Sequence, residues 1–305
     1  MATTYSSLSS GVRAFGREIR GLYRIRTRDV PGDVARTLAH LRDVERSAVA
    51  LGGSEHRGLD VLVVGCGQTP REVLGFGARN RVTGIDLDVV PTGIDPISYL
   101  RLLRQNGAVR VAKTLGRKAL GIDRRFAAEM QRQIGAPSAS SPVIRQMNAE
   151  AMSFADESFD LVYSYSVFEH LPDPAAVLAE MGRVLRPGGA GFVSAHYWTS
   201  ESGAHDIRVF AGDREDVPLW AHLRPAHRHE ITENAHLNYW RVEQYRRLFA
   251  SVPDGQVEVE FHEPDRLAVL ADELQRIRDA GELGGYADEE LLGVNISMMW
   301  RRPLP

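Results

Sequence analysis

The sequence has little cysteine, no long apolar run and no large excess of charge. One cysteine, Cys66, stands among 305 residues, so the chain can form neither an internal disulfide nor a cluster of thiolate metal ligands. No stretch approaches the roughly 18 consecutive apolar residues of a membrane-spanning helix, and the N-terminus lacks the apolar core of a secretory signal. These absences predict a cytoplasmic chain that does not cross a membrane.

Composition bounds the protein class. The formal net charge is -3, whereas a nucleic-acid-binding domain normally carries a basic excess, so we predict no nucleic-acid partner. Hydrophobic residues make up 43% of the chain, which is ordinary for a packed soluble protein. The length allows one large α/β domain or two small ones.

A buried strand followed at once by glycines lies within residues 59–70. Val61 to Val64 form an unbroken aliphatic run, which is typical of a strand buried on both faces of a parallel sheet. Gly65 and Gly67 follow, and glycine lets backbone amides approach a ligand directly. The helix expected from Pro70 would point its N-terminus at the same place.

A second short strand ends in a carboxylate. Residues 82–86 read Val-Thr-Gly-Ile-Asp, which places Asp86 about 20 residues after the first glycine, the interval at which an acid bonds the hydroxyls of a ribose. The two motifs together indicate a cofactor that contains a nucleoside.

Four further blocks follow in order. The chain reads Asn-Ala-Glu at 148–150, Ser-Phe-Asp at 158–160, Glu-His-Leu at 169–171 and Leu-Arg-Pro-Gly-Gly at 185–189. In order and spacing they resemble the class I S-adenosylmethionine-dependent methyltransferases, in particular the large group with Asp-Ala-Glu in the first block. The resemblance covers residues 59–88 and 142–305.

This resemblance implies a fold and a cofactor. The implied fold is α/β, with a Rossmann-like, seven-stranded, mostly parallel sheet, an antiparallel last strand, helices on both faces and helical insertions. The implied cofactor is S-adenosyl-L-methionine, with Asp86 on its ribose and Asn148 and Ala149 on its adenine. The cofactor-binding residues expected from these positions are Gly65, Cys66, Gly67, Asp86, Leu87, Asn148, Ala149 and Ser164.

The glycine turn departs from that family at Val63, where an acid is usual, and at Thr69, where a third glycine is usual. Both changes bear on how the methionine end of the cofactor is held. We interpret Cys66 as a buried filler rather than a nucleophile. A nicotinamide-dependent oxidoreductase is disfavoured because its third glycine would fall at Pro70. A non-catalytic cofactor-binding or regulatory module of the same fold is the alternative from another class.

Two basic segments lie outside the resemblance. Residues 1–58 are expected to form N-terminal helices, and their first 28 residues carry six arginines against one acid. A helix packed over the main domain, a membrane-surface contact and a transit peptide are open interpretations of these 28 residues. The second segment is a helical insertion at 89–141 in the methyltransferase domain, 59–305. Nine basic residues against two acids between 101 and 132 fit a solvated face, or a site for an anionic acceptor or a lipid head group.

The segment 197–238 is rich in histidine and aromatic residues. Six of the ten histidines lie between positions 196 and 236, and we interpret the segment as a lid that closes over an acceptor and excludes water. The sequence has no His-Glu-x-x-His or other defined ligand spacing, and we interpret His227-Arg-His229-Glu230 as an adventitious cluster. The sequence therefore predicts no metal site.

Two histidines follow neighbouring strands and are the catalytic candidates. His196 follows the fifth expected strand, and His170 follows the fourth. Because reacting groups in open α/β sheets lie at the carboxyl ends of strands, either imidazole could take a proton from an acceptor, with His196 first. His170 also has a structural interpretation, since the resembling proteins share Glu-His-Leu while using different acceptors.

These patterns predict transfer of the sulfonium methyl group by in-line displacement, with a rate that can come mostly from alignment of the reacting atoms. The predicted acceptor atom is an oxygen, or secondarily a nitrogen, of a small-molecule, sugar or lipid-linked compound. Peripheral membrane contact through the basic segments is a further prediction.

Overall fold

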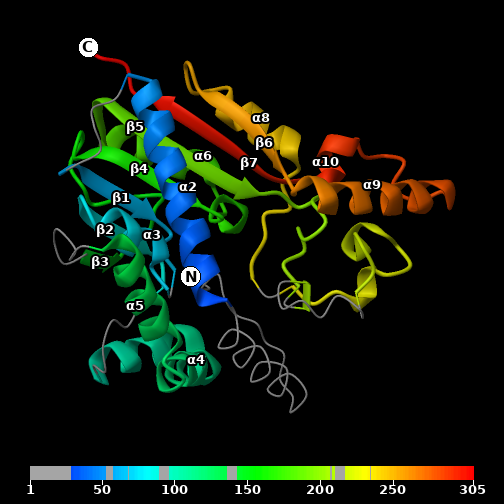
Figure 1. Ribbon diagram of the computed structural model, residues 1–305, viewed down its shortest axis with the longest axis horizontal. Coiled ribbons are helices and arrows are strands. Elements are labelled where there is room, and N and C mark those ends of the chain that lie inside the picture. The colour runs from blue at the N-terminus through cyan, green and yellow to red at the C-terminus, as the bar shows by residue number, and fades with distance from the viewer. Residues whose placement is uncertain are drawn as a thin grey trace.

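The computed structural model describes residues 29–52, 58–67, 69–88, 96–135, 143–206, 208–209, 217–233 and 235–305. The amphipathic segment expected within residues 1–28 lies outside them. Figure 1 shows one sheet with helices against both faces, and the segment after β5 lies at one end of the sheet, beside α9.

Seven strands form the sheet in the order β3-β2-β1-β4-β5-β7-β6. Neighbouring strands are parallel except for β7, which is antiparallel to both β5 and β6. The predicted fold class is confirmed, including the antiparallel last strand. The strands are β1 (Asp60–Val64), β2 (Arg81–Asp86), β3 (Val143–Gln146), β4 (Phe159–Tyr165), β5 (Leu185–His196), β6 (Gln256–Phe261) and β7 (Gly293–Arg301).

The helices divide between the two faces of the sheet, and α4 and α5 lie within residues 89–141, the stretch interpreted above as an insertion. None of the helices in the described ranges is long and apolar enough to cross a bilayer. The helices are α2 (Val30–Ala50), α3 (Arg71–Phe76), α4 (Pro96–Ala119), α5 (Ile122–Ile134), α6 (Pro174–Val184), α8 (Val242–Phe249), α9 (Pro264–Asp279) and α10 (Asp288–Leu292).

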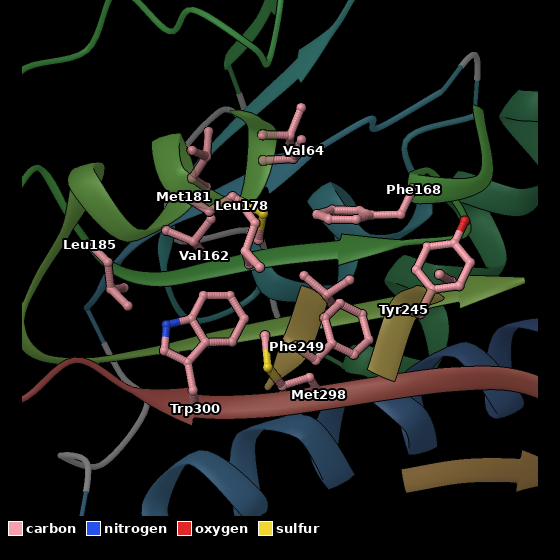
Figure 2. Packing of buried hydrophobic residues seen from close by; sticks show 14 of the residues in the cluster. Val64, Val162, Phe168, Leu178, Met181, Leu185, Tyr245, Phe249, Met298 and Trp300 are labelled. Carbon is pink, nitrogen blue, oxygen red and sulfur yellow. The ribbon is translucent and has the colours of Figure 1, made fainter. Parts of the chain in front are cut away.

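Strand β1 explains why the sequence has an unbroken aliphatic run. Successive side chains of a strand point to opposite faces, so Val61 and Val63 pack under α2 and α3, whereas Leu62 and Val64 pack under α6 and α8. Figure 2 shows Val64 in this second core. Burying a side chain of this size contributes roughly 1.5 to 3 kcal/mol, and a strand covered on both faces uses every position.

Strand β5 begins earlier than predicted. The sequence suggests a turn at the Arg-Pro-Gly-Gly block and a strand from Gly191, but Leu185 already pairs with Phe159, and Ala190 then pairs with Leu161. The residues between bulge out of the ladder, and Gly188 has a φ of 78°. Within the bulge, the Gly188 amide donates to the Arg302 carbonyl at 2.8 Å and the Gly189 carbonyl accepts from the Arg302 amide at 2.9 Å. These backbone bonds to a distant part of the chain override the local turn signal.

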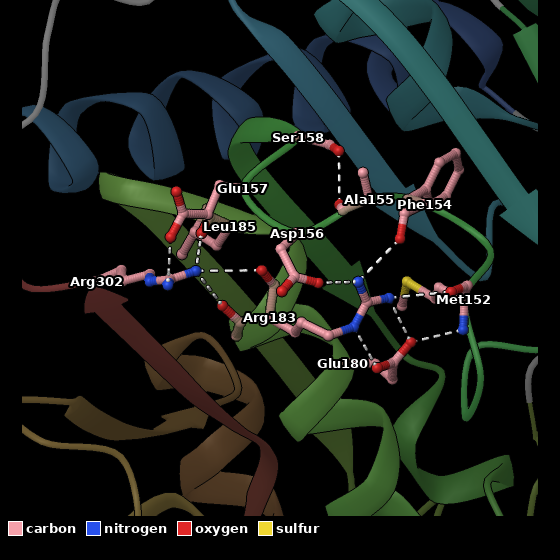
Figure 3. A network of polar contacts seen from close by, with 11 residues as sticks. Met152, Phe154, Ala155, Asp156, Glu157, Ser158, Glu180, Arg183, Leu185 and Arg302 are labelled. Atoms are coloured by element: carbon pink, nitrogen blue, oxygen red, sulfur yellow. Dashed lines mark hydrogen bonds and ion pairs between the residues drawn. The ribbon is translucent and has the colours of Figure 1, made fainter.

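Arg183 on α6 stabilises the connection between β3 and β4 through hydrogen bonds (Figure 3). This connection carries the predicted adenine-binding residues. The Arg183 guanidinium donates to the carbonyls of Met152 and Phe154 at 3.0 and 2.9 Å and pairs with Glu180 at 2.7 Å. Glu180 in turn accepts from the Met152 amide at 2.6 Å. A planar fork of donors suits this set of acceptors, whereas a lysine would serve only some of them.

Replacing Arg183 with methionine is therefore expected to lower the free energy of unfolding by about 1 to 2 kcal/mol, discounted for the half-exposed pairs. Urea denaturation measures the change. The matched control is Arg46→Met, which breaks an exposed pair with Asp43 within α2 and should have no measurable effect. Equal stability losses in the two variants would contradict this role of Arg183.

The histidine-rich segment packs against α9 and α10. Trp220 is fully buried in a small core with Leu270, Leu274 and Leu291, and its indole Nε1 donates to the Leu291 carbonyl at 3.1 Å. The described part of the segment is thus anchored on its outer side. Closure over an acceptor stays a prediction.

Candidate functional site

The glycine turn after β1 has the backbone that the sequence suggested. Gly65 and Gly67 have φ angles of 74° and 63°, and a Cβ at Gly65 would lie 2.3 Å from a methyl carbon of Val167. Such a conformation and such a close approach both require glycine. The amides of Gly65 and Cys66 donate to the Ile85 carbonyl at 2.8 and 3.0 Å. The turn is therefore held against the end of β2.

Asp86 lies directly beside this turn. Its carboxylate accepts from the Gly67 amide at 2.8 Å and from the Asp88 amide at 2.8 Å. A carboxylate has about four lone-pair positions, so ribose hydroxyls can bond in addition to these amides. Asp86 therefore shapes the glycine turn as well as standing at the predicted ribose position, a second role that the sequence did not suggest.

The predicted adenine-binding residues lie at the same edge of the sheet. The Met147 amide donates to the Asp86 carbonyl at 2.9 Å, which brings Asn148 and Ala149 beside the end of β2. Asn148 is exposed, and its side-chain oxygen accepts from the Glu150 amide at 3.0 Å. The side chain of Leu87 is 45% exposed there. The structure thus gathers the amide side chain and an apolar surface beside Asp86.

Two of the predicted cofactor residues point into the protein. Cys66 is 3% exposed, and burial raises the pKa of its thiol, which keeps it protonated and fits the interpretation as a filler. Ser164 is fully buried and its hydroxyl donates to the Val64 carbonyl at 3.3 Å. Contacts of either residue with a cofactor would therefore use the backbone.

Thr69, where the family usually has glycine, connects the glycine turn to the insertion. Its hydroxyl donates to Asp123 in the first turn of α5 at 3.0 Å. Arg117 of α4 pairs with Asp123 at 2.6 Å and also donates to the Thr69 hydroxyl. The basic insertion is therefore bonded to the predicted cofactor loop, and the departure from glycine has a structural use.

His196, the first catalytic candidate, is bonded at both ring nitrogens. Its Nδ1 lies 3.1 Å from Oδ1 of Asn295, whose amide orientation is set by donation to Glu260 at 3.0 Å. Nδ1 therefore carries the proton. Nε2 lies 2.9 and 3.0 Å from the hydroxyls of Ser200 and Ser202, either of which can donate to its one lone pair. His196 would therefore lose a hydrogen bond before taking a proton from an acceptor.

Glu169, His170 and His205 come together beyond the ends of β4 and β5. Glu169 and His170 belong to the short 3-10 helix η1 (Phe168–His170), and His205 comes from the segment after β5. Oε1 of Glu169 lies 4.0 Å from Nε2 of His205. The His205 ring meets His170 and His196 edge to face, at centroid distances of 4.9 and 5.1 Å. The sequence pointed to both of these partners but gave no role to Glu169 or His205.

Burial keeps this group uncharged. It raises the pKa of Glu169 to about 8 and lowers the pKa of His196 to about 4. Burial, reinforced by the neighbouring imidazoles, lowers the pKa of His205 to about 2. A cation placed among these groups would favour the ionised carboxylate instead.

Asn238 holds η1 in place. Its side-chain amide donates to the Phe168 carbonyl at 2.8 Å and to the Leu171 carbonyl at 3.3 Å, and its backbone amide donates to the Glu169 carbonyl at 2.9 Å. The sequence carried no signal for this residue, because its partners lie almost seventy positions away.

The remaining histidines of the segment have separate surroundings. His222 bonds the Trp198 carbonyl at 2.8 Å, and His227 pairs with Glu230 at 2.8 Å on the surface. The backbone carbonyl of His236 accepts from Nδ1 of His170 at 2.8 Å. The histidine-rich composition thus resolves into one buried cluster and several individual contacts.

A family model and several sequence relatives described as methyltransferases match parts of this chain. The family described as "Methyltransferase domain" matches residues 101–193, which begin inside the insertion and end in β5. An uncharacterized methyltransferase of Mycobacterium avium (strain 104) is 44% identical over 57 residues, which are 19% of this chain and 22% of the relative. One of Mycobacteroides abscessus is 39% identical over 67 residues, 21% of this chain and 26% of the relative. The chain thus spans about a quarter or less of the length of these relatives.

Similar solved structures include phosphoethanolamine N-methyltransferase 2 of Haemonchus contortus in complex with S-adenosyl-L-methionine. It is 16% identical, with a TM-score of 0.42, over 85% of this chain and 53% of that chain. The [4+2]-cyclase SpnF is 16% identical, with a TM-score of 0.38, over 86% of this chain and 81% of that chain.

Proposed function

We propose that the chain binds S-adenosyl-L-methionine and transfers its methyl group to an oxygen of a small-molecule, sugar or lipid-linked acceptor. The match of residues 101–193 to a methyltransferase domain and the order of the seven strands support the proposal. A nitrogen acceptor is the secondary form of the proposal. The observation that carries it is the placement of the glycine turn, Asp86 and Asn148 at one edge of the sheet.

The chemistry fits that placement. Backbone amides and the Asp86 carboxylate would hold the nucleoside, so that the methyl group would be presented beyond the ends of β4 and β5, where the Glu169, His170 and His205 side chains lie. Holding the acceptor atom, the methyl carbon and the sulfur in line supplies much of the rate in such a displacement.

Calorimetry with S-adenosylmethionine tests the binding step, and formation of S-adenosylhomocysteine in the presence of hydroxyl-bearing compounds tests turnover. We expect binding in both the presence and the absence of an acceptor. Lack of binding would overturn the proposal. Binding with no turnover across oxygen and nitrogen acceptors would favour the non-catalytic module of the same fold.

The insertion supports a second proposal, that α4 contacts an anionic lipid surface. Ile97, Leu100 and Leu103 are 63%, 47% and 44% exposed at three-residue spacing, and the exposed Arg101 and Arg104 lie on the same helix. Apolar side chains interleaved with arginines are the pattern by which a helix lies on an anionic membrane surface.

Co-sedimentation with vesicles of phosphatidylserine and phosphatidylcholine tests this contact. We expect binding at 0.1 M salt, where screening acts over about 10 Å, and much less at 1 M, where it acts over about 3 Å. The double change Arg101→Gln and Arg104→Gln should weaken binding by roughly tenfold or more. The control, Arg42→Gln with Arg46→Gln on α2, should bind like the wild type. No sedimentation at low salt would leave only a soluble acceptor for the basic insertion.

A further inference from the structure

The strongest unexplained feature of the described chain is the buried carboxyl of Glu169. It is 2% exposed, and neither oxygen accepts a hydrogen bond from a described residue. The 4.0 Å separation from Nε2 of His205 is too long for a hydrogen bond. Buried carboxyl groups are normally bonded, paired or bound to a metal ion, because leaving one unsatisfied costs free energy.

Two imidazoles share this place with the carboxyl. One nitrogen each of His170 and His205 and one oxygen of Glu169 all lie within 4.8 Å of one another. Nδ1 of His170 donates to the His236 carbonyl at 2.8 Å, which leaves Nε2 as the nitrogen with a lone pair. A metal-binding histidine usually has its other ring nitrogen fixed in this way.

We propose that Glu169, His170 and His205 form a binding site for a divalent transition-metal ion, Zn²⁺ in the first instance. Two imidazole nitrogens and one carboxylate oxygen are a donor set that Zn²⁺ accepts. Ligand atoms at roughly 2.1 Å from the ion would be about 3.4 Å apart in tetrahedral geometry, so the three side chains must draw together when the ion binds. His196 stays outside the set, because Asn295 and the two serines occupy its nitrogens.

This site deepens the proposed function and rests on it for its role. Three protein ligands leave a coordination position for an acceptor hydroxyl, which favours oxygen over nitrogen as the methylated atom. The bound hydroxyl releases its proton to water, and its oxygen attacks the methyl carbon. The O–C bond forms as the C–S bond breaks, the electron pair stays on sulfur, and the products are the methyl ether and S-adenosylhomocysteine.

Direct metal binding tests the site without depending on activity. Chelator-treated protein is titrated with Co²⁺, followed by visible absorption, and with Zn²⁺, followed by calorimetry and elemental analysis. We expect one ion per chain in the wild type, and binding weakened at least about 100-fold in Glu169→Gln and in His205→Gln, since even outer-shell changes cost 10- to 100-fold. The control is His227→Gln, which alters a surface histidine paired with Glu230 and should bind like the wild type.

Circular dichroism and S-adenosylmethionine calorimetry show whether each variant keeps its fold, and His205→Gln serves if Glu169→Gln does not fold. Absence of bound ion in the wild type, or metal affinity in both Glu169→Gln and His205→Gln equal to that of the wild type, would overturn the site. Metal binding without any cofactor turnover would retain the site and remove the proposed function. Turnover in chelator-treated protein that binds no ion would retain the proposed function and overturn the metal site.

Discussion

Asp86→Ala is expected to weaken S-adenosylmethionine binding by about 10- to 150-fold. Hydrogen bonds to a charged group contribute about 1.5 to 3 kcal/mol, and about 1.4 kcal/mol corresponds to tenfold in affinity. The carboxylate stands at the end of β2 and also accepts from the amides of Gly67 and Asp88. Its removal takes away a partner for the ribose and also releases the turn that the cofactor approaches.

Calorimetry separates these two consequences. Asp86→Asn keeps one acceptor oxygen but places an amide NH₂ group near a backbone donor, so it should bind more weakly than the wild type while folding normally. The control is Asp60→Ala. Asp60 is the first residue of β1, so it lies at the opposite end of that strand from the glycine turn, and it pairs with Arg81. Its cofactor affinity should be unchanged. Wild-type affinity in Asp86→Ala would remove Asp86 from the site.

The sheet could be predicted because its signals are local. The aliphatic run of β1 specifies its strand through neighbouring residues, and the structure has this strand where the sequence placed it. The start of β5 could not be predicted in the same way. Leu185 pairs with Phe159 of β4, 26 positions earlier in the chain, and the turn glycines bond to Arg302, more than a hundred positions later. These contacts decide the conformation against a local turn signal.

The candidate site likewise combines residues that local motifs predicted with residues that only the packed chain brings together. Gly65, Gly67 and Asp86 belong to motifs with fixed spacing, so their proximity followed from the order of two adjacent strands. His205 lies in a segment without regular periodicity, and no spacing relates it to Glu169. The burial of that carboxyl, with no hydrogen-bond partner in the described part of the chain, is a property of the packed protein. The one available signal was the acid beside the histidine in Glu-His-Leu.

The order of the two catalytic candidates also changes for a structural reason. Sequence position favoured His196, which directly ends a strand. The folded chain bonds both of its nitrogens and leaves it 7% exposed, a situation that suits a residue that positions others. Its role as a base stays a prediction, but the geometry favours His170, which belongs to η1 in the cluster with Glu169 and His205.

His170→Gln is accordingly expected to lower single-turnover methyl transfer by 10²- to 10⁴-fold, the usual range for loss of a group that handles the acceptor proton. The expectation holds whether the imidazole takes the proton itself or holds an ion that lowers the pKa of the hydroxyl. Cofactor affinity should stay nearly constant, because His170 lies outside the predicted nucleoside site, and a change in rate alone marks an interaction made in the transition state.

Two further variants make the His170 result specific. His222→Gln alters another buried histidine, which is hydrogen-bonded to the backbone carbonyl of Trp198 at 2.8 Å. Its rate should stay within about threefold of the wild type, well short of the range for a proton-handling group. His196→Gln should fall by about tenfold or less, since a glutamine can keep part of its hydrogen bonding to Asn295 and the serines. A loss of 10²-fold or more in His196→Gln, with His170→Gln near the wild-type rate, would restore His196 as the first candidate. If all three variants turned over at the wild-type rate, catalysis would rest on alignment of the reacting atoms alone.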